Sequence, residues 1–290
     1  MAKILTHVSF PLQGESPMLH VRDRFPLRLF SLGGCVIDER WGGGSSDMSS
    51  PFWRLYFNLD DGAEVHTQGT IVLPLAAGAL VVVPAWLSWR AHCRGNVRHG
   101  NAFFDLPALR RERVREHMPR PLVLAAPGEP LAAAWARFFR DIAAAPALTV
   151  KLESQGHALI WSALEVMFER TAPELSVTAR DTTDAGLAQA LYWAETNLDQ
   201  RIGRRELAEH ANLSEAELAR RFQEELGTSP ARWVRERRIS FAAELLRQTD
   251  EPVERIAERT GLGDRAHFSR VFARWCGQGP ASWRKAQRSV

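Results

Sequence analysis

The sequence predicts an α+β fold, in which an antiparallel β-barrel and a helical hairpin precede an all-helical C-terminal region. Three observations carry this prediction. Short strand patterns recur at roughly ten-residue spacing within residues 20–107, apolar residues fall at helical spacing after about residue 128, and a group of residues near the C-terminus recurs 50 positions later. A chain of 290 residues is long enough for two domains.

The strand predictions depend on alternation and on turn signals. We expect strands over residues 27–32, 52–59, 71–75 and 80–83. The first should end at Gly33-Gly34, and Asp60-Asp61-Gly62 after the second is a strong hairpin signal. Several short strands of this kind favour an antiparallel barrel or a jelly roll.

Two apolar stripes at helical spacing follow the strands, and Pro146 separates them. The first stripe contains Leu131, Trp135, Phe138, Phe139 and Ile142, and the second contains Leu152, Leu159, Ile160, Ala163, Leu164 and Met167. They predict a helical hairpin. The periodicity is then lost in a linker rich in Thr, Pro and Asp. We therefore expect a barrel over residues 1–128, a hairpin over 129–170, a linker over 171–183 and a helical domain over 184–290.

An internal repeat is the most informative feature of the helical domain. Arg220, Phe222, Gly227, Pro230 and Trp233 recur 50 positions later as Arg270, Phe272, Gly277, Pro280 and Trp283. Upstream, Leu207-Ala208-Glu209 corresponds to Ile256-Ala257-Glu258 at an offset of 49, and a one-residue change in the turn accounts for the difference. So many matches in order indicate two copies of one structural unit.

Each copy has the parts of a helix-turn-helix motif, over residues 204–226 and 253–276. In the first copy, Ser214 with Glu217 three residues later predicts a capping box at the start of the second helix. In the second copy, Asp264 is the expected N-cap. The second helices should end near Gly227 and Gly277, because glycine favours the left-handed cap conformation.

A long helix should join the two copies. Ser229-Pro230 predicts its start, since proline is favoured at the first helical position. About 18 residues give a rod of roughly 27 Å. Such a rod can hold two recognition helices about one turn of DNA apart, which is roughly 34 Å.

Charge and composition narrow the class of protein. Residues 228–290 carry 13 basic and 7 acidic side chains, whereas the rest carries 24 basic and 27 acidic ones. A basic end on a mildly acidic body suits contact with a polyanion, although a solvated basic face explains the charge alone equally well. We expect no membrane span, because no run of 18 or more apolar residues occurs, and no secretory signal. Cys35, Cys93 and Cys276 are few and widely spaced, which favours a reducing cytoplasm over a disulfide framework.

The motifs of residues 206–285 resemble the signature of the AraC/XylS family. The matching positions are Leu207-Ala208, Ser214, Leu218, Arg220, Phe222, Gly227, Ser229-Pro230, Arg238, Ala242, Leu245-Leu246, Ile256-Ala257, Gly261, Asp264, Phe268-Ser269-Arg270, Phe272, Gly277, Pro280, Trp283 and Arg284. Leu262, Gly279, Trp233 and Trp283 depart from the usual residue of that signature, but they stay apolar or small. The resemblance implies a double helix-turn-helix domain that binds double-stranded DNA, and an N-terminal cupin-like domain that binds a small effector.

Exposed positions on the two recognition helices are the predicted DNA contacts. They are Glu215, Ala216, Ala219, Arg220, Arg265, Ala266, His267 and Arg270. Arg265 can donate a bidentate pair to guanine, and Ala216 or Ala219 can contact a thymine methyl group. Three roles stay open for Arg220 and Arg270, namely contact with a base, binding of phosphate, and stabilisation of the fold. Arg235, Arg237 and Arg238 on the joining helix are expected to contact phosphate or to form intrahelical pairs. We expect the second unit to supply much of the base readout, since the first offers mostly alanines.

The front half suggests a place for an effector. The predicted effector-binding residues are Trp41, Arg54, Tyr56, Asn58, Trp86 and Arg90, since indole faces with polar groups can stack on a sugar or on an aromatic molecule. Arg54, Tyr56 and Asn58 share one strand face, which is either the barrel lumen or solvent, and we prefer the lumen. Trp53 and Trp89 are expected in the core. A carbohydrate is our candidate effector.

No metal or cofactor is expected. A metal cupin uses an HxH pair with a later histidine, whereas His66, His92 and His99 are isolated here. Two alternatives stay open beside an effector-responsive regulator. They are a cupin-type enzyme fused to a DNA-binding domain, and a regulator controlled without a small ligand. The expected partners of the regulator are DNA, an effector, a second copy of the chain in a homodimer and, for an activator, RNA polymerase.

Overall fold

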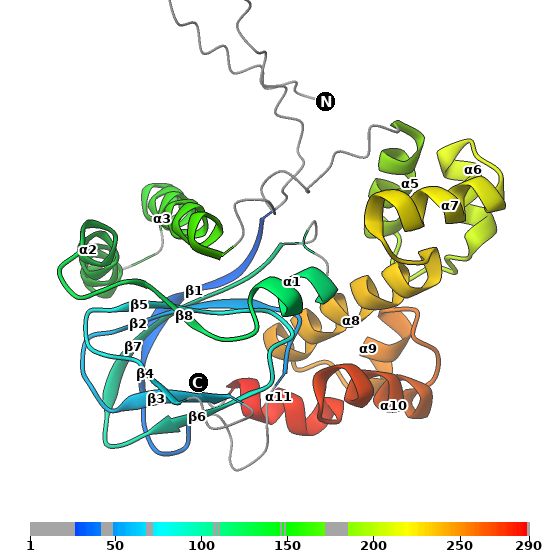
Figure 1. The fold of residues 1–290 in the computed structure, drawn as a ribbon. Coiled ribbons are helices and arrows are strands. Elements are labelled where there is room, and N and C mark those ends of the chain that lie inside the picture. Colours follow the sequence, from blue (N-terminus) through cyan, green and yellow to red (C-terminus); the bar gives the residue numbers. More distant parts are fainter. Residues whose placement is uncertain are drawn as a thin grey trace, which may run out of the picture.

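The structure is a computed structural model (Figure 1), and it describes residues 27–41, 49–67, 72–106, 109, 111–145, 147, 149–171 and 185–288. Two layers of β-structure and the helices α1 to α3, within residues 111–171, form the N-terminal part, and the helices from α5 onward, within residues 185–288, form the C-terminal part. The predicted linker over 171–183 lies outside the described residues apart from Thr171.

The N-terminal part contains two antiparallel sheets. Sheet A has the strand order β1 (Arg28–Ile37), β7 (Val97–Asp105), β2 (Trp53–Asn58), β5 (Leu80–Val83) and β8 (Leu122–Ala125). Sheet B has the order β4 (Val72–Pro74), β3 (Ala63–Thr67) and β6 (Trp89–Cys93). Within the described residues the strands pair only inside their own sheet, apart from an isolated bridge between Asn58 and Ala77, so they do not form a closed barrel.

Two strand predictions were wrong in detail. The first strand does not stop at Gly33-Gly34, because its pairing with β7 continues through both glycines to Ile37. The predicted hairpin at Asp60-Asp61-Gly62 is not one either. The turn is present, with Gly62 at a φ of 122°, but it carries the chain from β2 in sheet A to β3 in sheet B. A local turn signal cannot report which strand the chain meets next.

The predicted helical hairpin is present as α2 (Pro130–Ala144) and α3 (Val150–Thr171). Both helices cover the outer face of sheet A, opposite sheet B (Figure 1). Close contact requires glycine at two positions. A Cβ at Gly100 in β7 would lie 2.3 Å from the Phe139 ring, and a Cβ at Gly156 in α3 would lie 2.1 Å from Leu32. A short helix, α1 (Arg111–His117), precedes β8.

The C-terminal helices follow the predicted repeat. They are α5 (Ala185–Thr196), α6 (Arg204–Ala211), α7 (Glu215–Leu226), α8 (Pro230–Gln248), α9 (Val253–Arg259), α10 (Arg265–Cys276) and α11 (Pro280–Arg288). Helices α6–α7 and α9–α10 are the two helix-turn-helix units, and α8 joins them as the expected rod (Figure 1).

The two units differ in how their cores are closed. Helices α5 to α7 share a separate apolar cluster that includes Leu187, Leu207 and Phe222. The second unit belongs to a much larger cluster, which runs from the α2–α3 hairpin across sheet A to Phe272 and Trp283. The second helix-turn-helix unit is therefore packed on the N-terminal part, whereas the first has a core of its own.

Candidate nucleic-acid interface

The two recognition helices, α7 and α10, begin and end as their sequences predict. The side chain of Ser214 accepts a hydrogen bond from the Glu217 amide at 3.2 Å, and Asp264 accepts one from the His267 amide at 2.7 Å. This backbone hydrogen bond lowers the pKa of the Asp264 carboxyl. Gly227 and Gly277 end the helices in the left-handed conformation. Two local signals, an N-cap side chain and a left-handed glycine, thus fix the length of each recognition helix.

The predicted contact residues lie on the outward faces of these helices. On α7, Leu218 and Phe222 are fully buried. Ala219 is half-buried, while the other predicted contacts are exposed, and these are Glu215, Ala216 and Arg220. The predicted contacts on α10 are all exposed, and these are Arg265, Ala266, His267 and Arg270. Both helices therefore present these residues to a partner while their apolar stripes face inward.

Glu217 departs from the predicted capping box. Its carboxylate pairs with Arg220 and Arg221 instead of turning back to the helix start. Arg220 donates from Nε and Nη2 to the two Glu217 oxygens at 2.9 and 2.6 Å, and from Nη1 to Glu224 at 2.5 and 2.6 Å. We call Glu217, Arg220 and Glu224 the Arg220 clamp. The hydrogen bonds that the Arg220 guanidinium donates to Glu217, and then those to Glu224, raise its pKa.

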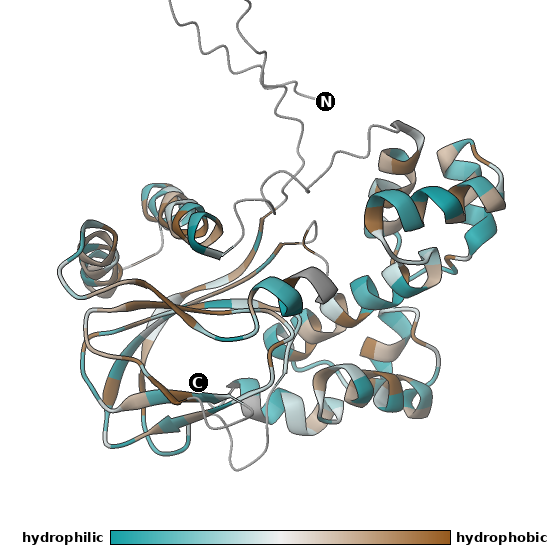
Figure 2. Ribbon diagram, in the orientation of Figure 1, coloured by the Kyte–Doolittle hydropathy of each residue, from teal (hydrophilic) through white to brown (hydrophobic). Residues whose placement is uncertain are grey.

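The recognition helices differ in charge. Four glutamates and two arginines lie on α7, whereas α10 carries three arginines, one histidine and no acidic residue. Figure 2 shows that hydrophilic and hydrophobic residues alternate along the helices of both units. On α10, Arg265 is tethered to Glu254 at 2.5 Å, and Arg270 forms no ion pair with any described residue. The second helix is the one suited to a polyanion.

The arginines of the joining helix do not all face outward as expected. Arg238 donates to the carbonyl oxygens of Leu198, Gly261 and Gln200, and so ties α8 to both units. Arg237 is buried and pairs with Asp105 of β7 at 2.9 Å and with Glu195 of α5. The expectation of phosphate contacts or intrahelical pairs was wrong for these two residues, because long-range partners take up their donors.

Arg237 lies at a junction of three elements. Burial alone would lower the pKa of its guanidinium, but the charges of Glu195 and Asp105 outweigh burial and raise it. Glu195 also accepts a hydrogen bond from Arg28 of β1 at 2.8 Å. Sheet A, α5 and α8 are thus held together by one ionic cluster.

The end of the second unit is inserted against sheet A. Trp283 of α11 is fully buried, its indole N–H donates to the Ser49 carbonyl at 2.9 Å, and its ring contacts Phe52. Gln287 accepts a hydrogen bond from the buried Arg54 guanidinium at 2.9 Å. Trp86, whose φ of 64° is unusual for a large side chain, packs on Trp275 of α10.

The predicted effector residues do not form one group. Arg54, Tyr56, Asn58 and Trp41 are buried on the side of sheet A that faces sheet B. Arg90 is exposed on the outer face of β6, because strand alternation turns it away from Trp89 and Ala91. Trp86 belongs to the contact with α10. Arg90 and Trp86 are therefore separated from the other four residues.

Aromatic side chains lie between the two sheets. Trp41 lies 5.1 Å from His99 and 6.3 Å from Trp89, measured between ring centroids. His99 bonds to Asn58 through Nδ1, and burial lowers the pKa of its imidazole to about 3. Among the described residues, three buried nitrogens of this group have no hydrogen-bond partner, namely Trp41 Nε1, Trp89 Nε1 and His99 Nε2. His99 and Trp89 were not predicted for this group, although His99 has the same strand parity as Asn101 and Phe103.

The other two histidines that were considered as metal ligands, His66 and His92, lie in sheet B. His66 and His92 stack at 4.2 Å between ring centroids on neighbouring strands of sheet B, and His66 bonds to Glu64. Among the described residues, no group of three or more His, Cys, Asp or Glu side chains is arranged to hold a metal ion.

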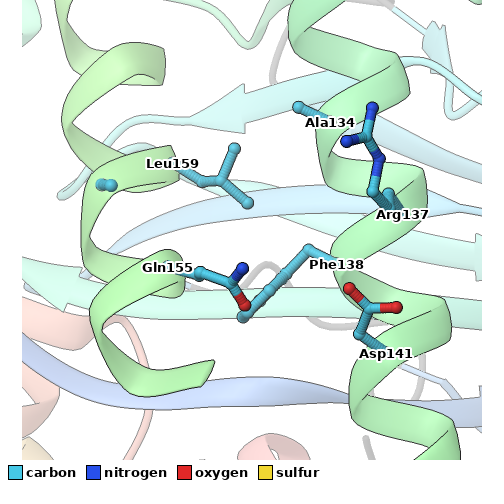
Figure 3. Close-up of a pocket in the computed structure, with 7 residues that line it drawn as sticks. Ala134, Arg137, Phe138, Asp141, Gln155 and Leu159 are labelled. Carbon is cyan, nitrogen blue, oxygen red and sulfur yellow. The ribbon is translucent and has the colours of Figure 1, made fainter. Parts of the chain in front are cut away.

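A surface pocket lies between α2 and α3 (Figure 3). Its walls include Arg137, Phe138 and Asp141 from α2, with Gln155 and Leu159 from α3. None of the predicted effector residues lines it. In the described part of the chain, no helix has both the length and the apolarity needed to cross a membrane.

Comparison with known proteins agrees with this architecture. Residues 207–286 match the helix-turn-helix domain family. The chain is similar to the HTH-type transcriptional activator RhaS of Klebsiella pneumoniae strain 342, with 34% identity over 142 residues, which are 48% of this chain and 50% of that protein. RhaS of Citrobacter koseri is 37% identical over 91 residues, or 31% of this chain and 33% of that protein. The chain thus covers half or less of the length of these two relatives.

Solved structures show the same fold over most of the chain. ToxT from Vibrio cholerae O395 superposes with a TM-score of 0.52, covering 93% of this chain and all of that one at 8% identity. A second ToxT structure, bound to (E)-4-(8-methylnaphthalen-1-yl)but-3-enoic acid, gives a TM-score of 0.53 over 90% of this chain and 99% of that one, also at 8% identity. The paired helix-turn-helix units define an AraC-type domain. The match over residues 207–286 and the similarity to RhaS identify this domain as that of the AraC/XylS family.

Proposed function

We propose that this chain is a transcription regulator that binds a specific sequence in double-stranded DNA through α7 and α10. The observation that carries this proposal is the pair of capped, outward-facing recognition helices on one rod. The 19 residues of α8 correspond to about 28 Å at 1.5 Å per residue, close to one DNA turn. The contact residues are those exposed on α7 and α10, with Arg265 and Arg270 suited to base edges or phosphate.

Selection of duplexes from a random pool tests this function. The full chain should enrich a sequence with two half-sites in neighbouring major grooves. Binding to the enriched duplex should weaken when Arg270 is replaced by Gln, and it should keep its strength when the distant Lys151 of α3 is replaced by Gln. A protein that retains no duplex above the background of the pool would contradict the proposal.

We also propose that residues 1–128 form a cupin-like effector domain and that the effector is held between the two sheets. The support is the group of buried nitrogens without partners in Trp41, Trp89 and His99, because buried polar groups in proteins are normally satisfied. Two indoles and a tyrosine ring offer flat apolar faces beside these donors. A carbohydrate, with many acceptor oxygens, remains our candidate effector.

A thermal-shift screen with a panel of sugars tests the effector proposal. A ligand that binds the folded state should raise the melting temperature. The response should be lost when Trp41 is replaced by Phe, which removes an N–H donor. It should be retained when Tyr192, which is exposed on α5, is replaced by Phe. If no sugar raises the melting temperature, a carbohydrate is excluded. Control by a partner protein or by abundance would then be favoured.

The remaining assignments follow from the same function. We propose that the α2–α3 hairpin joins two copies of the chain, with Val150 and Trp161 exposed on it. The regulator would act in the cytoplasm without catalytic activity of its own, and as an activator it would contact RNA polymerase.

A further inference from the structure

The Arg220 clamp occupies the outward face of the first recognition helix. Each of the three nitrogens of the Arg220 guanidinium donates to a carboxylate, two to Glu217 and one to Glu224. All three side chains are at least partly exposed, with side-chain accessibilities of 53%, 31% and 55% for Arg220, Glu217 and Glu224. The clamp is therefore a surface feature at the position where a recognition helix meets DNA.

Arg220 lies on a helix whose net charge is negative. Arg221 also pairs with Glu217, so the two arginines balance the carboxylates of Glu217 and Glu224, and Glu215 and Glu225 leave α7 with a net charge of −2. The corresponding arginine of the second unit, Arg270, has no carboxylate three or four residues away, because those positions on α10 are Ala266, His267, Ala273 and Arg274. Two arginines that the repeat places at equivalent positions thus present opposite electrostatic surroundings.

A DNA phosphate competes poorly for a guanidinium that already has two carboxylate partners. Exposed ion pairs of this kind are individually weak, so DNA can break them. The free energy of DNA binding must then offset both the loss of these ion pairs and the repulsion between phosphate and the two carboxylates. Carboxylates in the major groove accept hydrogen bonds from the amino group of cytosine. The acidic surface of α7 therefore weakens binding to DNA of any sequence. Only base edges that offer hydrogen-bond donors to the carboxylates offset this loss of affinity.

We propose, against the expectation from the sequence that the second unit supplies much of the base readout, that the Arg220 clamp makes the first unit the discriminating half of the DNA-binding domain. The second unit supplies most of the affinity. Glu217 and Glu224 are specificity-determining residues in this assignment, and they act by holding Arg220 away from phosphate. The assignment rests on the proposed function, because it concerns the same DNA interface.

A double variant, E217Q/E224Q, tests the assignment in the full chain. The substitution keeps the Ser214 cap, which uses the backbone amide of residue 217. Binding is measured to the duplex enriched from the random pool and to the same duplex with the α7 half-site scrambled. We expect affinity for the enriched duplex to rise about tenfold near 0.15 M salt, and the salt dependence to steepen by about one ion. Affinity for the scrambled duplex should rise further, so that the specificity ratio falls at least about threefold.

A matched control separates the clamp from total charge. The variant E209Q/E258Q removes two exposed carboxylates that also pair with arginines, Arg205 and Arg255, on the first helices of the two units. It should change the specificity ratio by less than about twofold. The assignment is wrong if E217Q/E224Q, folded by circular dichroism, shows an unchanged specificity ratio, or if the control lowers that ratio equally. Failure of the wild-type chain to bind any duplex would instead remove the proposed function itself.

Discussion

Arg220 and Arg237 each have two carboxylate partners, but their surroundings give the pairs different weight. The side chain of Arg237 is 6% exposed and that of Arg220 is 53% exposed. Water screens the exposed pairs, so they add little to stability. The buried pairs cannot lose one member without leaving charges in a medium that solvates them poorly.

Replacing Arg237 by Ala should therefore destabilise the chain by about 3–5 kcal/mol, because Asp105 and Glu195 would remain as buried charges. Urea denaturation followed by circular dichroism measures the change. The control is Arg205→Ala, which removes an exposed pair with Glu209 and should leave the denaturation midpoint nearly unchanged. Similar midpoints for the two variants would show that the ionic cluster around Arg237 is not structurally important.

His99 predicts a pH dependence of stability. Burial lowers its pKa from the ordinary 6.5 to about 3. Between these two pH values the imidazole is therefore protonated in the unfolded chain and neutral in the folded chain. Its contribution to stability is therefore fully present above pH 6.5 and is lost as the pH falls from 6.5 towards 3. The slope reaches at most about 1.4 kcal/mol per pH unit.

The variant His99→Gln should flatten the fall in unfolding free energy between pH 6.5 and 5, a range in which few carboxylates titrate. His66→Gln, on the outer sheet surface, is the matched control and should keep the wild-type slope. Parallel profiles for the wild type and His99→Gln would contradict the neutral, buried state of this imidazole.

Local signals were reliable at the scale of single elements. The bounds of the two helix-turn-helix units were predicted nearly residue by residue, because N-caps and left-handed glycines act within one turn. The strand pairing was not predictable in the same way. Asp60-Asp61-Gly62 carries a turn signal, but whether β3 pairs with β2 or joins another sheet depends on contacts far along the chain.

The two copies of the repeat differ in how deeply their equivalent tryptophans are buried, and the sequence did not predict this difference. Trp233 and Trp283 occupy equivalent positions, yet Trp233 is half-buried beside Phe222 and Trp283 is fully buried against Phe52. Nothing in the sequence distinguishes them, because the difference arises from the docking of sheet A on the second unit alone. The buried ion pair of Arg237 was missed for the same reason.

The docking of α11 can be tested directly. Trp283→Ala should cost about 3–5 kcal/mol of unfolding free energy through the lost packing, and Trp283→Phe should cost less because chiefly the hydrogen bond to Ser49 is removed. In hydrogen exchange, Trp283→Ala should accelerate amides of α10 and α11 while leaving α6 and α7 protected. Equal acceleration in both units would show that they do not have separate cores.

At the scale of the whole molecule, the rod α8 sets the geometry of the DNA site. Its length places two recognition helices about one turn apart on one face of the duplex, so the spacing of half-sites should be strict. Inserting five base pairs between the half-sites rotates one of them to the opposite face and should abolish joint binding. Inserting ten base pairs should return both half-sites to the same face of the duplex but leave them one turn further apart. Affinity should then equal that of a single helix-turn-helix unit bound to one half-site. Equal affinity for all three duplexes, measured by fluorescence anisotropy, would disprove a rigid rod.

The apolar cluster that runs from the α2–α3 hairpin to Trp283 has a practical meaning for the construction of hybrid regulators. A hybrid that carries another N-terminal module would be joined to this chain in the predicted linker, residues 171–183. Such a graft would keep both DNA-reading units, but it would strip Trp283 and Trp275 of Phe52 and Trp86, their partners in the original module. A functional hybrid must bring these contact residues with it, so the transplantable unit is the sensor module together with the surface that matches it on α8, α10 and α11.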